Sequence, residues 1–308
     1  AALCLLVWLV PLPRPFVLGA CFALIGAFLS STPPFQNAMA MDANHCGIPV
    51  VYGFCRGVGS VSYAAAVLLL GFVLERHAPT LLLPVFAALT ACGLLAMSGF
   101  RLPERPDEAA DRPAEHRSIA AVLRSHPRFA LTLLGCMFFF LTHTISNTYM
   151  NALVGKAGGT ASAVGTSLAI SAVLELPAMT LVSRLQKRFS PGFFLRFAAG
   201  AEVVKFLIFY LARSMPLIYL GQCMQFFQFA VYAPATVYYV AAALPERDQL
   251  KGQSLIYVAG SGLGGALGNL LGGRLLDRSG IQAALLLGTV SAAASLLTFC
   301  LSTREDSR

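Results

Sequence analysis

The sequence predicts an all-α membrane protein, a polytopic bundle of helices, on three observations. Of its 308 residues, 57% are hydrophobic and only 12% are charged, and the mean hydropathy is +0.71. Because an average soluble domain has roughly 25% charged residues, a soluble fold could not cover this much apolar surface. Apolar stretches near the roughly 20 residues that cross a bilayer recur along the chain. One long polar segment, residues 101–128, interrupts them.

The apolar stretches predict nine full transmembrane helices and a partial one. The partial helix is the run at residues 1–11, which has no initial Met, is too short to cross a bilayer and lacks the basic start of a signal peptide. We therefore expect the chain to be truncated at its N-terminus. The full spans are predicted at residues 14–41, 50–74, 79–100, 129–153, 162–183, 192–212, 216–243, 252–276 and 281–301.

The polar segment 101–128 predicts a cytoplasmic linker between two bundles. It contains six Arg and five acidic residues, and a short amphipathic helix is expected near Ser118–Arg124. The predicted domains are the remainder of an N-terminal bundle (1–100, the end of a third helix through a sixth), the linker (101–128), a six-helix C-terminal bundle (129–301) and a tail (302–308).

Positive charges predict the orientation in the membrane. When alternate loops are assigned to alternate sides, the linker side carries fourteen Lys and Arg residues and the other side carries six. Because cytoplasmic loops carry an excess of Lys and Arg, we expect the linker and the C-terminus to face the cytoplasm of a cell membrane.

Several classes of function are disfavoured by the composition. The eight Cys are scattered without a CxxC motif, and no paired His spacing occurs, so neither disulfides nor a metal site is expected. The net charge of +8 is spread over loops and forms no basic stripe, which argues against nucleic-acid binding. The spans contain no HExxH motif and no paired acids, so we predict no enzymatic activity and no cofactor.

Polar residues inside the spans mark the candidate site. Glu175 lies in the middle of GTSLAISAVLELPAMTLV, and a carboxylate at that depth normally faces a partner or a polar path. Other polar side chains repeat at helical spacing: His143, Asn147 and Asn151 in one span, and Gln222, Gln225, Gln228 and Tyr232 in another. The span 192–212 contributes Glu202 and Lys205.

These residues also have structural interpretations. His143 and Asn147 can hold the bundle together through a hydrogen bond, and function and structure are equally supported for them. Glu202 and Lys205 can neutralise each other as an i, i+3 pair, which favours a structural role for Glu202. Glu175 has no opposite charge on its own helix, so its partner must come from another helix or it must be protonated.

Glycines recur every fourth residue at 260, 264, 268 and 272, in GSGLGGALGNLLGG. Small residues at this spacing let membrane helices approach closely, whereas a dinucleotide site would require a preceding strand. We predict close helix packing here.

Four blocks in order carry a family resemblance: YGFCRGVGSVSYA, HTISN, LELPAM and KGQSLIYVAGSGLGGALGNLLGGRLLDRSG. With these blocks the chain resembles a transporter of the major facilitator superfamily. It is similar to the branch with lactose permease, the nucleoside:proton symporters and the phenylpropionate permease-like proteins, from that family's third helix onward. The resemblance implies the two-bundle architecture.

The resemblance also implies roles for single residues. Arg56, Glu175 and Lys205 fall where lactose permease has a sugar-binding arginine, a sugar-binding glutamate and a further arginine. Gln225 and Gln228 replace its tenth-helix histidine and glutamate, and Asn147 replaces one of its seventh-helix aspartates. Because neither Gln can titrate, the lactose-type proton relay is absent. We expect Glu175, Lys205, Arg56, Asn147, Gln225 and Gln228 to bind the solute, and Glu175 or His143 to carry the proton.

The expected function is secondary active transport of a small organic solute by alternating access, as a proton-coupled symporter. An efflux antiporter of the same fold is the alternative, and a non-transporting receptor is a weaker one. The expected partners are the solute, protons and the lipid bilayer, for a monomer. A sugar, a nucleoside and an aromatic acid all fit as solute, and the direction of transport and the coupling ion stay open.

Overall fold

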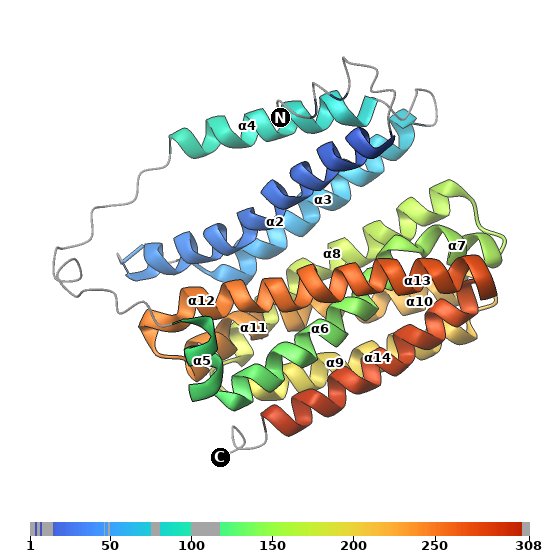
Figure 1. The fold of residues 1–308 in the computed structure, drawn as a ribbon. Helices are drawn as coiled ribbons and strands as arrows, with labels where there is room; N and C mark the ends of the chain where they lie inside the picture. Colours follow the sequence, from blue (N-terminus) through green and yellow to red (C-terminus); the bar gives the residue numbers. More distant parts are fainter. Residues whose placement is uncertain are drawn as a thin grey trace. The chain divides into compact units, whose positions relative to one another are not determined.

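The protein is described by a computed structural model at residues 4, 7, 15–45, 47–48, 50–74, 81–99 and 118–303. The chain in these ranges is helical and contains no strand, as the sequence predicts (Figure 1). Most of the linker, the last five residues and most of the first apolar run lie outside the described residues. The domain boundaries and the truncation therefore stay predictions.

The helices group into two compact units. One comprises residues 1–50 and 69–113 and contains α2 (Pro15–His45) and α4 (Leu82–Ser98). The other comprises residues 51–68 and 114–308, and includes most of α3 (Tyr52–Leu74). Its further helices are α5 (Ile119–Ser125), α6 (Pro127–Thr148), α7 (Met150–Lys156), α8 (Ala161–Leu185), α9 (Pro191–Leu211), α10 (Met215–Cys223), α11 (Phe229–Ala243), α12 (Glu246–Tyr257), α13 (Gly265–Ser279) and α14 (Ile281–Ser302).

Local sequence explains where these helices begin and end. Ser118 and Ser190 precede α5 and α9, and each hydroxyl accepts a hydrogen bond at 3.2 Å from the backbone N–H three residues on. Proline occupies the first turn of α6, α9 and α10, where its missing N–H costs nothing. Gly280 separates α13 from α14 with a φ of 77°, a conformation that favours glycine. The short helix predicted in the linker is confirmed as α5.

Five helical stretches in the described part are long and apolar enough to cross a membrane: Pro127–Thr148, Ser162–Leu185, Met215–Ala243, Glu246–Ser279 and Ile281–Ser302. Shorter apolar helices occur at Phe16–Leu29, Phe54–Leu70 and Leu82–Ser98. The α9 helix matches the predicted span 192–212 but carries Arg196, Glu202 and Lys205. The predicted count of nine full spans stays a prediction.

The α14 helix packs against both α6 and α9, and all three run alongside one another in Figure 1. Small residues allow the approach, since a Cβ added at Gly135 or Gly288 would lie 2.6 Å from Phe299 or 2.1 Å from Phe206. Hydroxyls then bridge the backbones: Ser295 Oγ donates to the Gly135 carbonyl at 3.0 Å. Such contacts are the usual means of holding membrane helices together.

The glycine ladder packs against α6, as predicted. A Cβ at Gly264 would lie 2.3 Å from the Met137 carbonyl oxygen, and one at Gly268 would lie 2.7 Å from that of Leu141. The first half of the ladder, Val258–Gly264, is wound as a π-helix between α12 and α13. The predicted span 252–276 is therefore one crossing built from three helical segments.

The predicted span 216–243 is likewise not one regular helix. After α10 the chain makes a 3₁₀ turn, Met224–Phe226, and α11 starts only at Phe229. Gln228 lies between them with φ −99° and ψ −95°, which is outside the helical region. Discontinuous helices of this kind line solute sites in many transporters.

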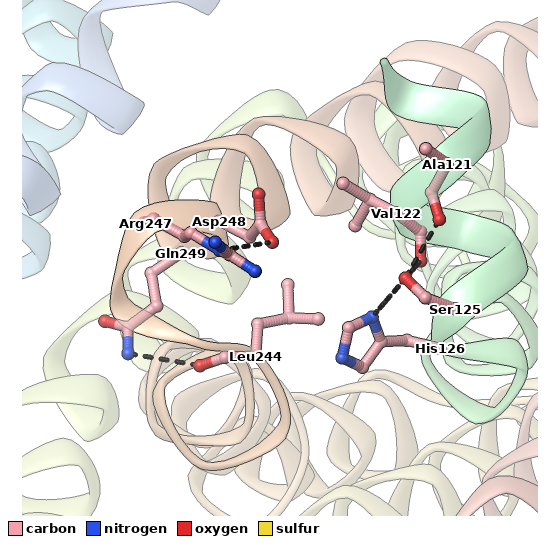
Figure 2. Close-up of polar contacts among 8 residues, drawn as sticks. All are labelled: Ala121, Val122, Ser125, His126, Leu244, Arg247, Asp248 and Gln249. Carbon is pink, nitrogen blue, oxygen red and sulfur yellow. Dashed lines mark hydrogen bonds and ion pairs between the residues drawn. The ribbon is translucent and has the colours of Figure 1, made fainter. Parts of the chain in front are cut away.

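Figure 2 shows α5 and the start of α12 at one end of this unit. Arg247 Nε lies 3.9 Å from Oδ2 of the buried Asp248, and Gln249 Nε2 donates to the Leu244 carbonyl at 3.3 Å (Figure 2). On α5, Ser125 Oγ donates to the Ala121 carbonyl at 2.9 Å and lies 3.0 Å from His126 Nδ1. These contacts lie at the C-terminal end of α5 and the N-terminal end of α12. None of these residues was predicted to bind solute.

Candidate functional site

Buried polar side chains from α8, α9 and the break between α10 and α11 meet inside the second unit. Glu175 on α8 and Lys205 on α9 are 8% and 2% exposed. Gln225 and Gln228, at the break, are 3% and 0% exposed. Four of the six residues predicted to bind solute are thus buried in this unit, and hydrogen bonds join three of them, Glu175, Lys205 and Gln225.

Gln225 connects the two charged residues. Lys205 Nζ donates to Gln225 Oε1 at 2.8 Å, and Gln225 Nε2 donates to Glu175 Oε1 at 3.0 Å. The amide therefore accepts from the cation at one end and donates to the carboxylate at the other. We call this arrangement, Lys205–Gln225–Glu175, the amide bridge. It places charged and neutral hydrogen-bonding groups next to each other: an ammonium, an amide and a carboxylate. Recognition of a hydroxyl-rich or zwitterionic solute requires such a combination of donors and acceptors.

Ser60 supplies the second partner of Glu175 and was not predicted. Its Oγ on α3 donates to Glu175 Oε2, and both residues belong to the same compact unit. A signal was available, because Ser60 follows Arg56 by four residues and so shares its helix face. Both hydrogen-bond partners of Glu175 are neutral and lie on other segments, and the expected opposite charge from another helix forms no ion pair with Glu175 among the described residues.

Arg56 and Asn147 are not joined to the amide bridge. Arg56 is half-buried on α3, with its guanidinium 3.9 Å from the Cβ position of Gly59 on its own helix. In the described residues it makes no hydrogen bond or ion pair to Glu175. Asn147 is exposed on α6, and its amide contacts His143. Their predicted role as solute ligands stays a prediction.

The expected pairing of Glu202 with Lys205 is corrected by the structure. Within residues 118–303 these two side chains form no ion pair with each other, because Lys205 turns to Gln225. Glu202 Oε1 instead accepts a hydrogen bond from Gln228 Nε2 at 3.0 Å. Each charged group is hydrogen-bonded to the amide of a residue at the break, Lys205 to Gln225 and Glu202 to Gln228. Tertiary packing therefore decides their partners, and the i, i+3 spacing does not.

His143 and Asn147 form the predicted i, i+4 contact, with Asn147 Nδ2 3.0 Å from His143 Nε2. The imidazole ring also stacks on Phe229 with centroids 4.4 Å apart and meets the edge of Phe140. Its Nδ1 is buried and has no hydrogen-bond partner. Two aromatic side chains therefore contact the ring.

The aromatic residues near the break pack within the bundle. Tyr232 is buried and stacks on Phe139 with centroids 3.9 Å apart. Phe229 stacks on His143, and Phe227 is 42% exposed. Two of these rings are thus already stacked on side chains of the protein.

No group of three or more His, Cys, Asp or Glu capable of holding a metal occurs among the described residues. The chemistry of the amide bridge is that of hydrogen bonding and charge compensation.

Buried charged residues at a broken helix of a membrane bundle are typical of secondary transporters. The comparison with known families points to the same class. The chain belongs to the major facilitator superfamily, since the sequence model of the MFS_1 like family matches residues 1–287. The predicted family is thereby confirmed, and with it a multi-pass membrane transporter.

Two relatives are similar over almost the whole chain. The maltose permease of Geobacillus stearothermophilus is 27% identical over 285 residues, which cover 92% of this chain and 71% of the permease. An uncharacterized transporter of Bacillus subtilis, YwbF, is 23% identical over 297 residues, covering 96% of this chain and 72% of that protein.

Solved structures show the same fold. The chain resembles the E. coli fucose:proton symporter FucP with a TM-score of 0.61 and 16% identity, over 97% of this chain and 80% of that one. FucP in an outward conformation matches with a TM-score of 0.58 and 16% identity, over 89% and 72% of the two chains. The predicted all-α, major-facilitator fold is confirmed.

Proposed function

We propose that this protein carries a small hydroxyl-rich solute, an oligosaccharide of the maltose type, across the cytoplasmic membrane in symport with protons. Family membership supports transport, and the similarity to a maltose permease over 92% of the chain supports a sugar as solute. The observation that carries the proposal is the amide bridge, in which a buried carboxylate, amide and ammonium lie in hydrogen-bond contact.

In this proposal Glu175 is the principal solute ligand. Its two oxygens are held by Ser60 and Gln225, and both of these neutral donors can be exchanged for sugar hydroxyls at little electrostatic cost. Lys205 compensates the charge of Glu175 through Gln225. A carboxylate kept in place in this way can bind solute without leaving an isolated charge in the membrane.

Alternating access is the mechanism we propose for the crossing. Rocking of helix bundles about a central site would expose that site to each side of the membrane in turn. Glu175, which binds the solute, can then also share the transported proton, with Lys205 influencing its charge state. The protein is proposed to act as a monomer, with no metal and no cofactor.

Uptake of radiolabelled maltose by right-side-out vesicles with an imposed proton-motive force tests the proposal. We expect wild-type vesicles to accumulate maltose and Glu175→Gln vesicles to lose accumulation at least tenfold, because a hydrogen bond to a charged group contributes about 1.5–3 kcal/mol. Glu246→Gln, on an exposed residue in the first turn of α12, is the matched control and should transport normally.

Two outcomes would contradict the proposal. Undiminished accumulation by Glu175→Gln would exclude Glu175 as ligand and as proton carrier. Accumulation only in inside-out vesicles would indicate an efflux antiporter instead.

A further inference from the structure

Glu202 and Gln228 form a second buried polar pair, separate from the amide bridge. Both side chains are 0% exposed, and Gln228 Nε2 donates to Glu202 Oε1 at 3.0 Å. The remaining oxygen of each group, Glu202 Oε2 and Gln228 Oε1, is buried and has no hydrogen-bond partner. The pair therefore contains one hydrogen bond and two unsatisfied acceptors.

An ionised Glu202 would leave this pair costly. Each buried acceptor without a donor costs about 1–3 kcal/mol, and a buried carboxylate that lacks a paired cation costs more. One proton on Glu202 Oε2 would remove both defects, because the carboxyl would become a donor and Gln228 Oε1 is an acceptor that lacks a donor. A planar carboxylic acid and a planar amide that share one hydrogen bond can close a second through these two oxygens.

The groups around Glu202 do not replace that proton. Lys205, on the same helix, acts on Glu202 electrostatically but donates its hydrogen bond to Gln225. Tyr232 on α11 also acts on Glu202 electrostatically, and no hydrogen bond joins its hydroxyl to Glu202. Glu175 on α8 competes for Lys205. The neighbouring α10 and α14 contain no Asp, Glu, Lys, Arg or His.

We propose that Glu202, held by Gln228, is a proton-binding carboxyl of this transporter and that it carries a proton while it is paired with Gln228. The proton would arrive from water on one side of the membrane and leave to water on the other when Lys205 exchanges Gln225 for Glu202. This inference rests on the proposed function, because coupling matters only if solute moves with protons. It adds to Glu175 and His143 a carboxyl for which the sequence favoured a structural role.

Infrared spectroscopy of the purified full-length protein in lipid vesicles at neutral pH tests the protonation directly and requires no solute. We expect a C=O stretching band of a protonated carboxylic acid that disappears in Glu202→Gln. Glu175→Gln should retain this band, and so should Asp248→Asn, which removes a buried carboxyl outside the site. A spectrum of Glu202→Gln with the full wild-type band would overturn the proposal.

Gln228→Leu provides a second measurement if Glu202→Gln does not fold. This variant keeps the carboxyl but removes both hydrogen bonds, so the band should move to higher frequency; an unmoved band would also overturn the proposal.

Transport separates this inference from the proposed function. We expect Glu202→Gln vesicles to lose proton-driven accumulation of maltose while still exchanging internal for external maltose. Proton-driven accumulation that persists in Glu202→Gln would overturn the coupling role. Wild-type vesicles that move no maltose at all would contradict the proposed function, and the infrared band would still decide whether Glu202 holds a proton.

Discussion

Gln225 is the residue through which Lys205 and Glu175 influence each other. Because the amide accepts from Nζ and donates to Oε1, neither charge can move without changing the hydrogen bonding of the other. A histidine at this position could change its own charge, whereas a glutamine can only transmit the arrangement of its neighbours. Gln225 therefore cannot itself bind or release the transported proton.

His143 is the residue for which the geometry argues against proton transfer. Asn147 Nδ2 also donates to the His143 carbonyl at 3.2 Å, which fixes the amide nitrogen toward the ring and makes Nε2 an acceptor. We therefore expect His143→Asn to lower transport no more than a few-fold and to leave its pH profile unshifted. The measurement is maltose uptake as a function of pH.

Phe229→Leu is the comparison for His143→Asn, since it removes the stacked ring and leaves the imidazole in place. A displaced pH optimum in His143→Asn, with the optimum of Phe229→Leu unchanged, would show that the imidazole titrates during transport.

The candidate site could be predicted in part from the sequence. A carboxylate in an apolar run and amides at helical spacing predicted that Glu175, Gln225 and Gln228 are buried polar residues. Polar side chains inside a membrane span are costly when they face lipid, so they normally face the interior of the bundle. Their partners could not be predicted. Whether Lys205 turns to Glu202 or to Gln225 depends on the break after α10, which lies on another part of the chain.

At the scale of elements, the glycine ladder determines how closely α13 and the π-helical segment approach α6. Gly264 lies against backbone, the Met137 carbonyl, and backbone cannot move aside as a flexible side chain can. Gly262, two residues earlier in the same segment, is exposed, and a Cβ there would meet no atom nearer than 3.7 Å. The two glycines form a matched pair.

We expect Gly264→Ala to destabilise the protein by about 1–3 kcal/mol, the usual cost of overpacking, and to lower its apparent melting temperature by several degrees. Gly262→Ala should change it little. Thermal unfolding of both purified variants is the measurement, and equal melting temperatures would show that the ladder does not limit packing.

Helix positions followed from hydropathy because the length of an apolar run is set by the bilayer. Hydropathy did not predict the two interruptions, the 3₁₀ turn at Met224–Phe226 and the π-helix at Val258–Gly264. A broken helix is tolerated only where neighbouring groups satisfy its freed backbone, so its position depends on tertiary contacts that a single run of residues does not display. Pro234 and the glycines of the ladder were the available local signals.

For the whole molecule, the positive charges predict the direction in which the bundle crosses the membrane. Lys and Arg are more numerous on the side that holds the linker, which predicts that the linker and the C-terminus are cytoplasmic. The predicted span 192–212 corresponds to α9; Lys187 lies just before this helix and Arg213 just after it, and both are exposed. Cysteines placed at these two positions test whether this span crosses the membrane and in which direction.

We expect a membrane-impermeant maleimide added to intact cells to label Arg213→Cys but not Lys187→Cys, with Lys187→Cys becoming labelled once the cells are permeabilised. The parent protein without an added cysteine gives the background, which should be low because Cys136, Cys4 and Cys21 are buried or half-buried and the exposed Cys55, Cys92 and Cys223 lie in apolar helices. The physical reason for the expected pattern is the cost of moving the positively charged linker side across the membrane during insertion. Labelling of Lys187→Cys from outside, with Arg213→Cys protected, would reverse the orientation and with it the side from which Glu202 would take up its proton.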